Sequence, residues 1–112
     1  MKVNLSSSPF GSFARTRVLL SLQLLVESYP RELARFLDLN LSSVQKALRS
    51  LEKDGIVAGR SVGRTRVYRL NPRAFARPEL ERYLERLLEP EDGLRERAAS
   101  LRRRPRRAGK PL

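Results

Sequence analysis

The side chains best suited to do chemistry in this chain lie in one stretch between Leu41 and Lys53. Apolar residues recur there at helical spacing and leave one face to side chains that donate or accept hydrogen bonds. The polar residues on that face are Ser42, Ser43, Gln45, Lys46 and Arg49. Gln can pair with adenine, Arg or Lys with guanine, and Ser with a base or a phosphate. No acidic residue lies between Leu41 and Leu51, so this face is expected to read the base edges of DNA.

Two further groups of cations follow this stretch. The first group flanks Gly63, a residue typical of a turn between two strands, and consists of Arg60, Arg64 and Arg66. We expect these side chains to contact the DNA backbone or to enter the minor groove. The second group lies near the end of the sequence and consists of Arg102, Arg103, Arg104, Arg106 and Arg107. We expect it to hold phosphates without reading sequence.

The composition favours a polyanionic partner and excludes several kinds of chemistry. The 112 residues include 24 Lys or Arg and 12 Asp or Glu, which gives a net charge of +12. Nucleic acid is the first candidate for the partner, and an anionic membrane surface is the second. The chain has neither His nor Cys, so it lacks the commonest general base, a thiolate nucleophile and the commonest metal ligands. We therefore expect no catalytic site, no metal site and no cofactor, and we expect a protein that is not an enzyme.

The most apolar run, residues 18–26, is far shorter than the ~20 residues that span a bilayer. It is better explained as part of an amphipathic helix. We therefore expect a cytoplasmic protein with no membrane partner.

Periodicity and end signals predict the elements that position these side chains. Residues 1–11 are Ser-rich and are expected to form a flexible arm. Asn40 is a good helix N-cap, and Gly55 is typical of the residue just past a helix end. The predicted helices cover residues 12–28, 30–37, 41–53, 78–88 and a short segment from 92, and the predicted strands cover residues 56–61 and 65–70. We expect one domain over residues 12–90, with a dimerisation helix at its C-terminal end, and a basic extension over 91–112.

Three segments in order carry a family resemblance. Residues 31–48 form a predicted helix-turn-helix, residues 51–57 run Leu-Glu-Lys-Asp-Gly-Ile-Val, and residues 63–72 form a predicted return strand. Together they resemble the winged helix-turn-helix regulators of the ArsR-like and MarR-like type. The resemblance implies a mainly α fold with a small β-hairpin wing, in which residues 41–53 are the recognition helix.

The chain departs from that family at three points. Asp38 stands where the family usually has Gly, and Asp tolerates a left-handed conformation better than most residues. Asn40 and Leu41 stand where the family often has Ser-Pro, and Asn caps a helix equally well. The metal-sensing members use Cys and His, which this chain lacks, so metal sensing is not carried over.

The first predicted helix is apolar on two faces, which indicates that it is covered from both sides. Phe13, Leu20 and Leu24 fall opposite Val18 and Leu22 at about 100° per residue. The fourth predicted helix carries a second leucine stripe. We expect the two stripes to form a homodimer interface made of Phe13, Leu20, Leu24, Leu80, Leu84, Leu87 and Leu88. The alternative is that the C-terminal helix of the same chain covers the second face.

These observations predict a dimeric, sequence-specific transcriptional regulator that binds double-stranded DNA. One alternative is an architectural nucleic-acid-binding protein, which would bind with a flat sequence preference. Another is a winged-helix module for protein interaction, which would be expected to carry an acidic or apolar face in place of the basic one.

Overall fold

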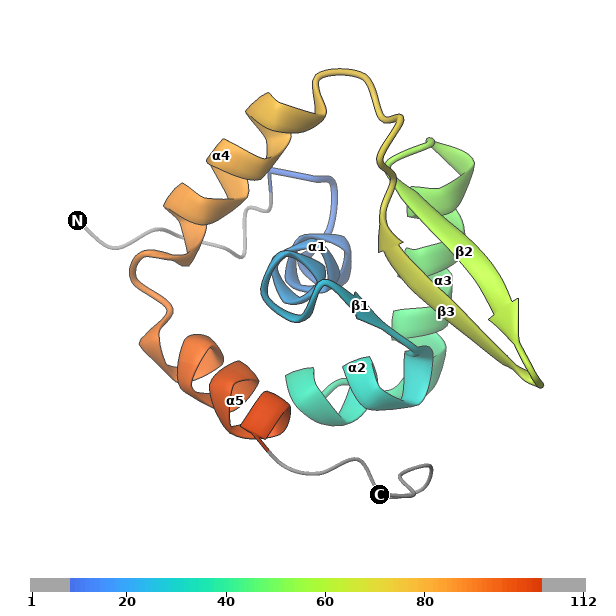
Figure 1. Cartoon of the computed structure of the whole chain (residues 1–112), viewed down its shortest axis with the longest axis horizontal. Helices are drawn as coiled ribbons and strands as arrows, with labels where there is room; N and C mark the ends of the chain where they lie inside the picture. The colour runs from blue at the N-terminus through green and yellow to red at the C-terminus, as the bar shows by residue number, and fades with distance from the viewer. Residues whose placement is uncertain (1–8, 104–112) are drawn as a thin grey trace.

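The computed structural model describes residues 9–103 as a mostly helical chain with a small antiparallel sheet (Figure 1). The helices of this part of the chain are α1 (Phe13–Leu25), α2 (Pro30–Leu37), α3 (Leu41–Lys53), α4 (Arg77–Leu88) and α5 (Asp92–Arg103). Its strands are β1 (Glu27–Ser28), β2 (Val57–Val62) and β3 (Thr65–Leu70). The strand order is β1-β3-β2, and both neighbouring pairs are antiparallel. No helix within residues 9–103 is both long enough and apolar enough to cross a membrane.

Local signals set the geometry of α2, α3 and the turn between them, and both helices have the predicted bounds. Asp38 ends α2 in the left-handed conformation, with a φ of 57°. Asn40 caps α3, because its Oδ1 accepts a hydrogen bond from the backbone N–H of Ser43 at 2.8 Å. Gly55 follows α3 with a φ of 80°, which glycine adopts without steric cost. The predicted turn, cap and stop signals are confirmed.

The first helix is shorter than predicted. It ends at Leu25 because Val26 has a φ of 73°, an outlier conformation for a β-branched residue. Val26 is consequently exposed, although it belongs to the most apolar run of the sequence, residues 18–26. β1 follows at once and pairs with β3, with Glu27 opposite Arg69. A strand of two residues shows no alternation of its own, which is why periodicity extended the predicted helix across it.

Other boundaries differ from the predictions by small amounts. β2 runs from Val57 to Val62, one residue later than predicted, so the hairpin turns at Gly63 and Arg64. α4 begins one residue before Pro78. α5 runs twelve residues, to Arg103, and so includes the start of the predicted basic tail.

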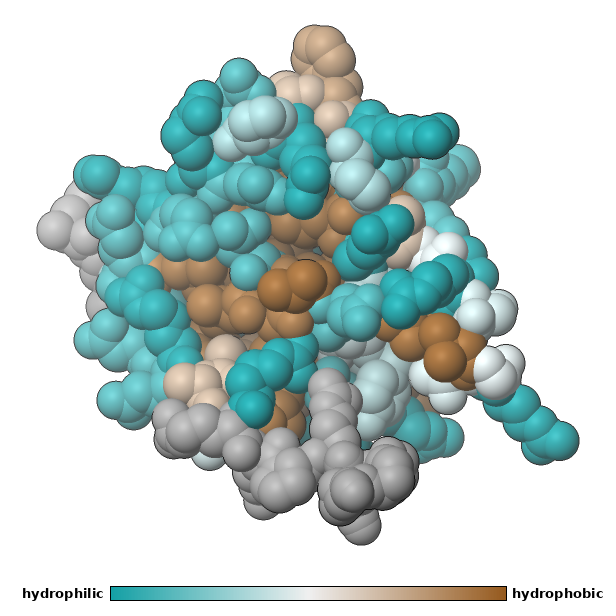
Figure 2. All heavy atoms as spheres, in the orientation of Figure 1, coloured by the Kyte–Doolittle hydropathy of each residue, from teal (hydrophilic) through white to brown (hydrophobic). Residues whose placement is uncertain are grey.

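α1 is buried from both sides by its own chain. It contacts α3 and β3, and it also contacts α4 and α5, which lie across from α3 in Figure 1. Figure 2 shows apolar side chains gathered over the middle of this view and surrounded by hydrophilic ones. The core includes both expected faces of α1, with Val18 and Leu20 fully buried.

This burial corrects the predicted dimer interface. Leu20, Leu84, Leu87 and Leu88 lie in the core of the single chain, so a second copy cannot reach their side chains. The C-terminal helices of the same chain cover the second face of α1, as the alternative interpretation held. Of the predicted set, Phe13 alone is exposed, while Leu24 and Leu80 are partly buried against the core.

Arginines tie these elements together. Arg15 donates to the Phe10 carbonyl at 2.6 Å and pairs with Asp54 at 3.1 Å, which joins the start of α1 to the end of α3. Arg17 pairs with Glu91 at 3.1 Å and so joins α1 to the connection between α4 and α5. Arginines paired in this way are less available to bind an external partner. The net charge counted from the composition therefore overstates the number of free cations.

Arg102, which was predicted to bind phosphate, also joins two elements of the fold. Its Nη2 donates to the carbonyl oxygens of Leu25 and Glu27, with the Glu27 oxygen at 3.1 Å. These carbonyls flank Val26, where α1 ends and its last carbonyls have no partner within the helix. The guanidinium therefore joins α5 to the end of α1. Arg104, Arg106 and Arg107 lie outside the described residues, as does the side chain of Arg103.

Arg102→Ala is expected to lower the free energy of unfolding by about 1–3 kcal/mol, because it leaves the two carbonyls without their donor. Urea denaturation followed by circular dichroism measures this loss. Arg95→Ala is the matched control, since Arg95 lies on the same helix and bonds only to Glu89 and Asp92 nearby. An equal loss of stability in both variants would contradict the role assigned to Arg102.

Candidate nucleic-acid interface

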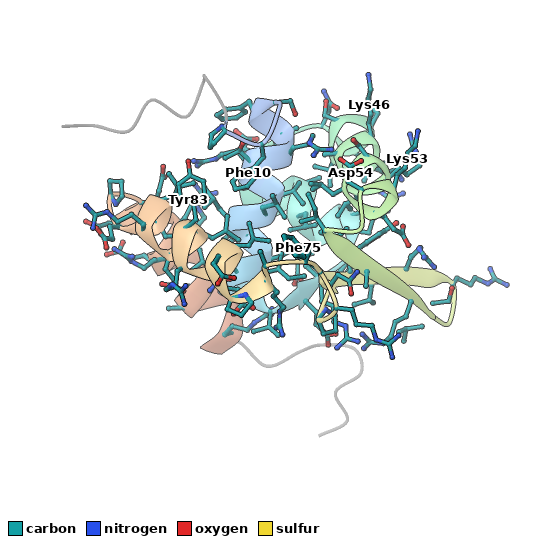
Figure 3. The ribbon with its side chains drawn as sticks, turned by 90° about the horizontal axis from the view of Figure 1, so that it is seen from above. Phe10, Lys46, Lys53, Asp54, Phe75 and Tyr83 are labelled. Carbon is teal, nitrogen blue, oxygen red and sulfur yellow. The ribbon has the colours of Figure 1, made fainter. Side chains whose placement is uncertain are left out.

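α3 presents the predicted polar face to solvent. Its apolar residues Val44, Ala47, Leu48 and Leu51 are buried, as predicted. Of the predicted base-reading residues, Ser42, Gln45, Lys46 and Arg49 are exposed and Ser43 is partly buried. Figure 3 shows Lys46 and Lys53 pointing away from the body of the molecule on α3. The face therefore combines hydrogen-bonding groups with positive charge.

Ser42 and Ser43 are engaged differently from the rest of this face. The Ser42 hydroxyl donates to Asn40 Oδ1 at 3.0 Å, and the Ser43 backbone N–H donates to the same oxygen at 2.8 Å. Both serines are thus part of the cap that starts α3. A Ser42 contact to DNA requires its hydroxyl to turn away from Asn40.

A groove of about 410 Å³ separates α3 from the hairpin formed by β2 and β3. We call it the α3–hairpin groove. Gln45 and Arg49 line it from α3, and Arg64 lines it from the hairpin turn. Tyr29 and Arg31 line it from the start of α2. The groove thus holds two residues predicted to read bases, Gln45 and Arg49. It also holds Arg64, which was predicted to contact the DNA backbone or the minor groove.

Arg66 also lines this groove, but a set of contacts within the chain holds it. Its Nη2 pairs with Glu52 of α3 at 2.6 Å, and its guanidinium lies 5.7 Å from the centre of the Tyr68 ring. The hydrogen bond that Arg66 donates to the Glu52 carboxylate raises the pKa of the Arg66 side chain. Gly59 leaves the room for this arrangement, because a Cβ there would lie 2.8 Å from Arg66 Nε. Arg66 therefore joins the hairpin to α3, a contact that the spacing of the sequence did not indicate.

Arg60 lies on the other face of the sheet. It stands opposite Val67 in the register, whereas Gly59 stands opposite Tyr68, and successive residues of a strand alternate between faces. Its Nη1 pairs with Glu27 Oε1 at 2.9 Å. Of the three hairpin arginines predicted to contact DNA, Arg64 alone is exposed without a hydrogen bond or ion pair to another described residue.

Free positive charge is unevenly distributed over residues 9–102. Every arginine of α1, α4 and α5 with a described side chain makes an ion pair or hydrogen bond. These paired residues are Arg15, Arg17, Arg77, Arg82, Arg86, Arg95, Arg97 and Arg102. The cations whose side chains make neither belong to α2, α3, the hairpin and the loop that follows it. They are Arg31, Arg35, Lys46, Arg49, Lys53, Arg64, Arg69 and Arg73.

This distribution adds residues that the sequence reasoning missed. Arg31 lines the groove although it was treated only as part of the helix-turn-helix segment. Its place at the second position of α2, next to the turn that leads in from β1, was the available signal. The sequence around Lys53 and Arg73 does not show that these side chains are unpaired. Whether a cation is paired depends on where the fold places the Asp and Glu carboxylates.

No protein-family model and no curated protein matches this sequence.

Proposed function

We propose that this chain is a winged helix-turn-helix transcriptional regulator that binds double-stranded DNA with sequence preference. In this proposal α3 is the recognition helix and lies in the major groove, and the hairpin is the wing. The order of two helices joined by a tight turn and followed by a hairpin supports this assignment. Gln45, Lys46 and Arg49 are the base-reading residues, and Arg64 contacts the backbone or the minor groove.

The observation that carries the proposal is the segregation of unpaired cations. Within residues 9–102, every described arginine side chain of α1, α4 and α5 makes an ion pair or a hydrogen bond. The side chains of Arg49 and Lys46 on α3 make neither. Arg49 lines the α3–hairpin groove and Lys46 is exposed on the same helix, and free cations beside hydrogen-bonding side chains suit a polyanion with readable edges. This surface does not suit a protein-interaction module, because exposed cations repel a basic partner and are costly to bury against an apolar one.

Selection of bound fragments from genomic DNA, followed by footprinting, tests the proposal. We expect the bound fragments to share a sequence, and the footprint to cover it at salt concentrations that remove non-specific binding. Binding of equal strength to all fragments would replace the regulator with the architectural protein. Absence of binding by the folded chain would refute both.

We also propose that the chain forms a homodimer. Its interface is smaller than the one predicted from the sequence, because most of the predicted residues are buried within the single chain. Phe13 of α1 and Tyr83 of α4 are 46% and 45% exposed. The Tyr83 ring lies 5.7 Å from that of Phe10, and Figure 3 shows the two side by side between α1 and α4. A second copy is the partner we infer, because a two-fold dimer matches a palindromic site.

Tyr83→Glu is expected to convert the dimer to a monomer in sedimentation, since it places a charge within an apolar contact. Phe75→Glu is the matched control, because Phe75 is 98% exposed in the loop before α4 and belongs to no proposed contact. A wild-type chain that sediments as a folded monomer at tens of micromolar would contradict the dimer.

A further inference from the structure

The outer face of the sheet holds a cluster of charges that the α3–hairpin groove does not use. Glu27 lies at its centre, and we call it the Glu27 cluster. Arg60 of β2 pairs with the Glu27 carboxylate at 2.9 Å. Arg69 of β3 stands directly opposite Glu27 in the register. Arg102 of α5 donates to the Glu27 carbonyl at 3.1 Å. The hairpin and α5, which are far apart in the sequence, therefore bring three arginines around Glu27.

The Glu27 cluster has an excess of positive charge. Three guanidinium groups surround a single carboxylate, and Arg60, Arg69 and Arg102 together hold the pKa of Glu27 below its ordinary value, with the Arg60 hydrogen bond as the largest cause. Glu27 therefore stays ionised and neutralises one of the three charges. The side chain of Arg69 makes no hydrogen bond or ion pair with another residue in the described part of the chain.

The one ion pair in the cluster is exposed and replaceable. The side chains of Arg60 and Glu27 are 52% and 46% exposed. Exposed pairs of this kind contribute little stability, because water screens them. A phosphate that approaches Arg60 and Arg69 can therefore take the place of the Glu27 carboxylate.

The cluster lies across the hairpin from the α3–hairpin groove. Glu27, Arg60 and Arg69 share one face of the sheet through the pairings of β1 with β3 and of β2 with β3. Arg66 and Tyr68, which line the groove, lie on the opposite face. The two cationic surfaces are thus separated by the thickness of one sheet. Each groove of a duplex has a phosphate strand on both sides, so a hairpin lying at a groove meets phosphates on both faces.

We propose that Arg60, Arg69 and Arg102 form a second phosphate-binding surface, which extends the contact of this chain along the same DNA duplex past the hairpin. Glu27 acts as a competitor within this surface and weakens its hold on phosphate. Arg102 keeps its bonds to the carbonyls of α1 and β1 and contributes charge, while Arg60 and Arg69 supply the contacts. This inference rests on the proposed function, because it assumes that the partner is duplex DNA.

Glu27→Gln is the first test, measured by fluorescence anisotropy on a random-sequence duplex of about 30 base pairs, roughly three helical turns. We expect several-fold tighter binding, and a slope of log K against log salt that steepens by about 0.9 for one additional phosphate. Glu79→Gln is the matched control, because it makes the same change in net charge on α4, where Glu79 pairs with Arg82 at 3.7 Å. We expect it to change binding little.

Arg69→Gln is the reciprocal test. We expect it to weaken binding several-fold and to flatten the salt slope by about 0.9. Arg82→Gln is its control for net charge, and circular dichroism checks that each variant is folded. The Arg69 side chain makes no hydrogen bond or ion pair with another described residue, so we expect the substitution to leave the fold intact.

Two results would overturn the second surface alone. In one, each variant matches its control while Arg49→Ala still weakens binding to a selected operator. In the other, sedimentation finds two duplexes on each protein copy, which places the second surface on a different duplex. A folded wild-type chain that binds no duplex overturns the proposed function as well, so the two failures are distinguishable.

Discussion

Arg49→Ala is expected to weaken binding to a selected operator by about 1–3 kcal/mol and to relax the preference at particular base pairs. Arg49 is exposed on α3 and lines the α3–hairpin groove, and its side chain makes no hydrogen bond or ion pair within residues 9–103. An arginine in this position can make two hydrogen bonds to guanine, and this contact is specific for the base. Anisotropy titrations on operator and scrambled duplexes measure the effect.

Arg82→Ala serves as the control for loss of one positive charge. Arg82 lies on α4 and pairs with Glu79. We expect it to affect operator and scrambled DNA equally and slightly. If Arg49→Ala also lowered both affinities by the same factor, Arg49 would be a backbone contact and the base-reading role would belong elsewhere on α3.

Leu20→Ala is expected to cost about 2–5 kcal/mol of unfolding free energy, the range for removing a buried leucine and leaving a cavity. Leu20 is fully buried between α1 and the helices that cover it. This cost is a large part of the stability of a small domain. Urea denaturation measures the change in free energy, and sedimentation follows the association state.

Leu24→Ala is the matched control, since Leu24 lies on the same helix and is only partly buried. We expect a smaller loss of stability there. The dimer interpretation of Leu20 would return if Leu20→Ala kept the unfolding free energy of the wild type and only changed the association state.

The local parts of the fold were predictable from the sequence because short-range signals determine them. The Asn40 cap and the left-handed Asp38 fixed both ends of the turn between α2 and α3. The apolar spacing of α3 then determined which side chains face outward, so Gln45 and Arg49 were placed correctly on an exposed face. Each of these features depends on residues within one or two helical turns.

Features that depend on distant partners were not predictable. The leucine stripes showed that α1 and α4 are covered, but no pattern shows whether the cover is the same chain or a second copy. β1 is too short to carry a period and exists because Glu27 and Ser28 reach β3. The roles of Arg66 and Arg102 depend on Glu52 and on the carbonyls of α1 and β1, which lie far away in the sequence.

The bonds of Arg102 to the carbonyls of Leu25 and Glu27 also change how the basic C-terminal segment is to be tested. A truncation that begins at residue 102 removes the tie to α1 together with the charges that follow it, so it mixes folding with DNA contact. A truncation after residue 103 leaves the tie in place and isolates the charges of residues 104–112.

We propose that α3 and the hairpin form the DNA-binding surface. Mapping amide chemical shifts of the labelled protein during titration with operator duplex tests this most directly. We expect the largest changes on residues 41–49 of α3 and residues 60–66 of the hairpin, with little change on the exposed face of α4. Large changes confined to α4 and α5, with residues 41–49 unmoved at saturation, would contradict it.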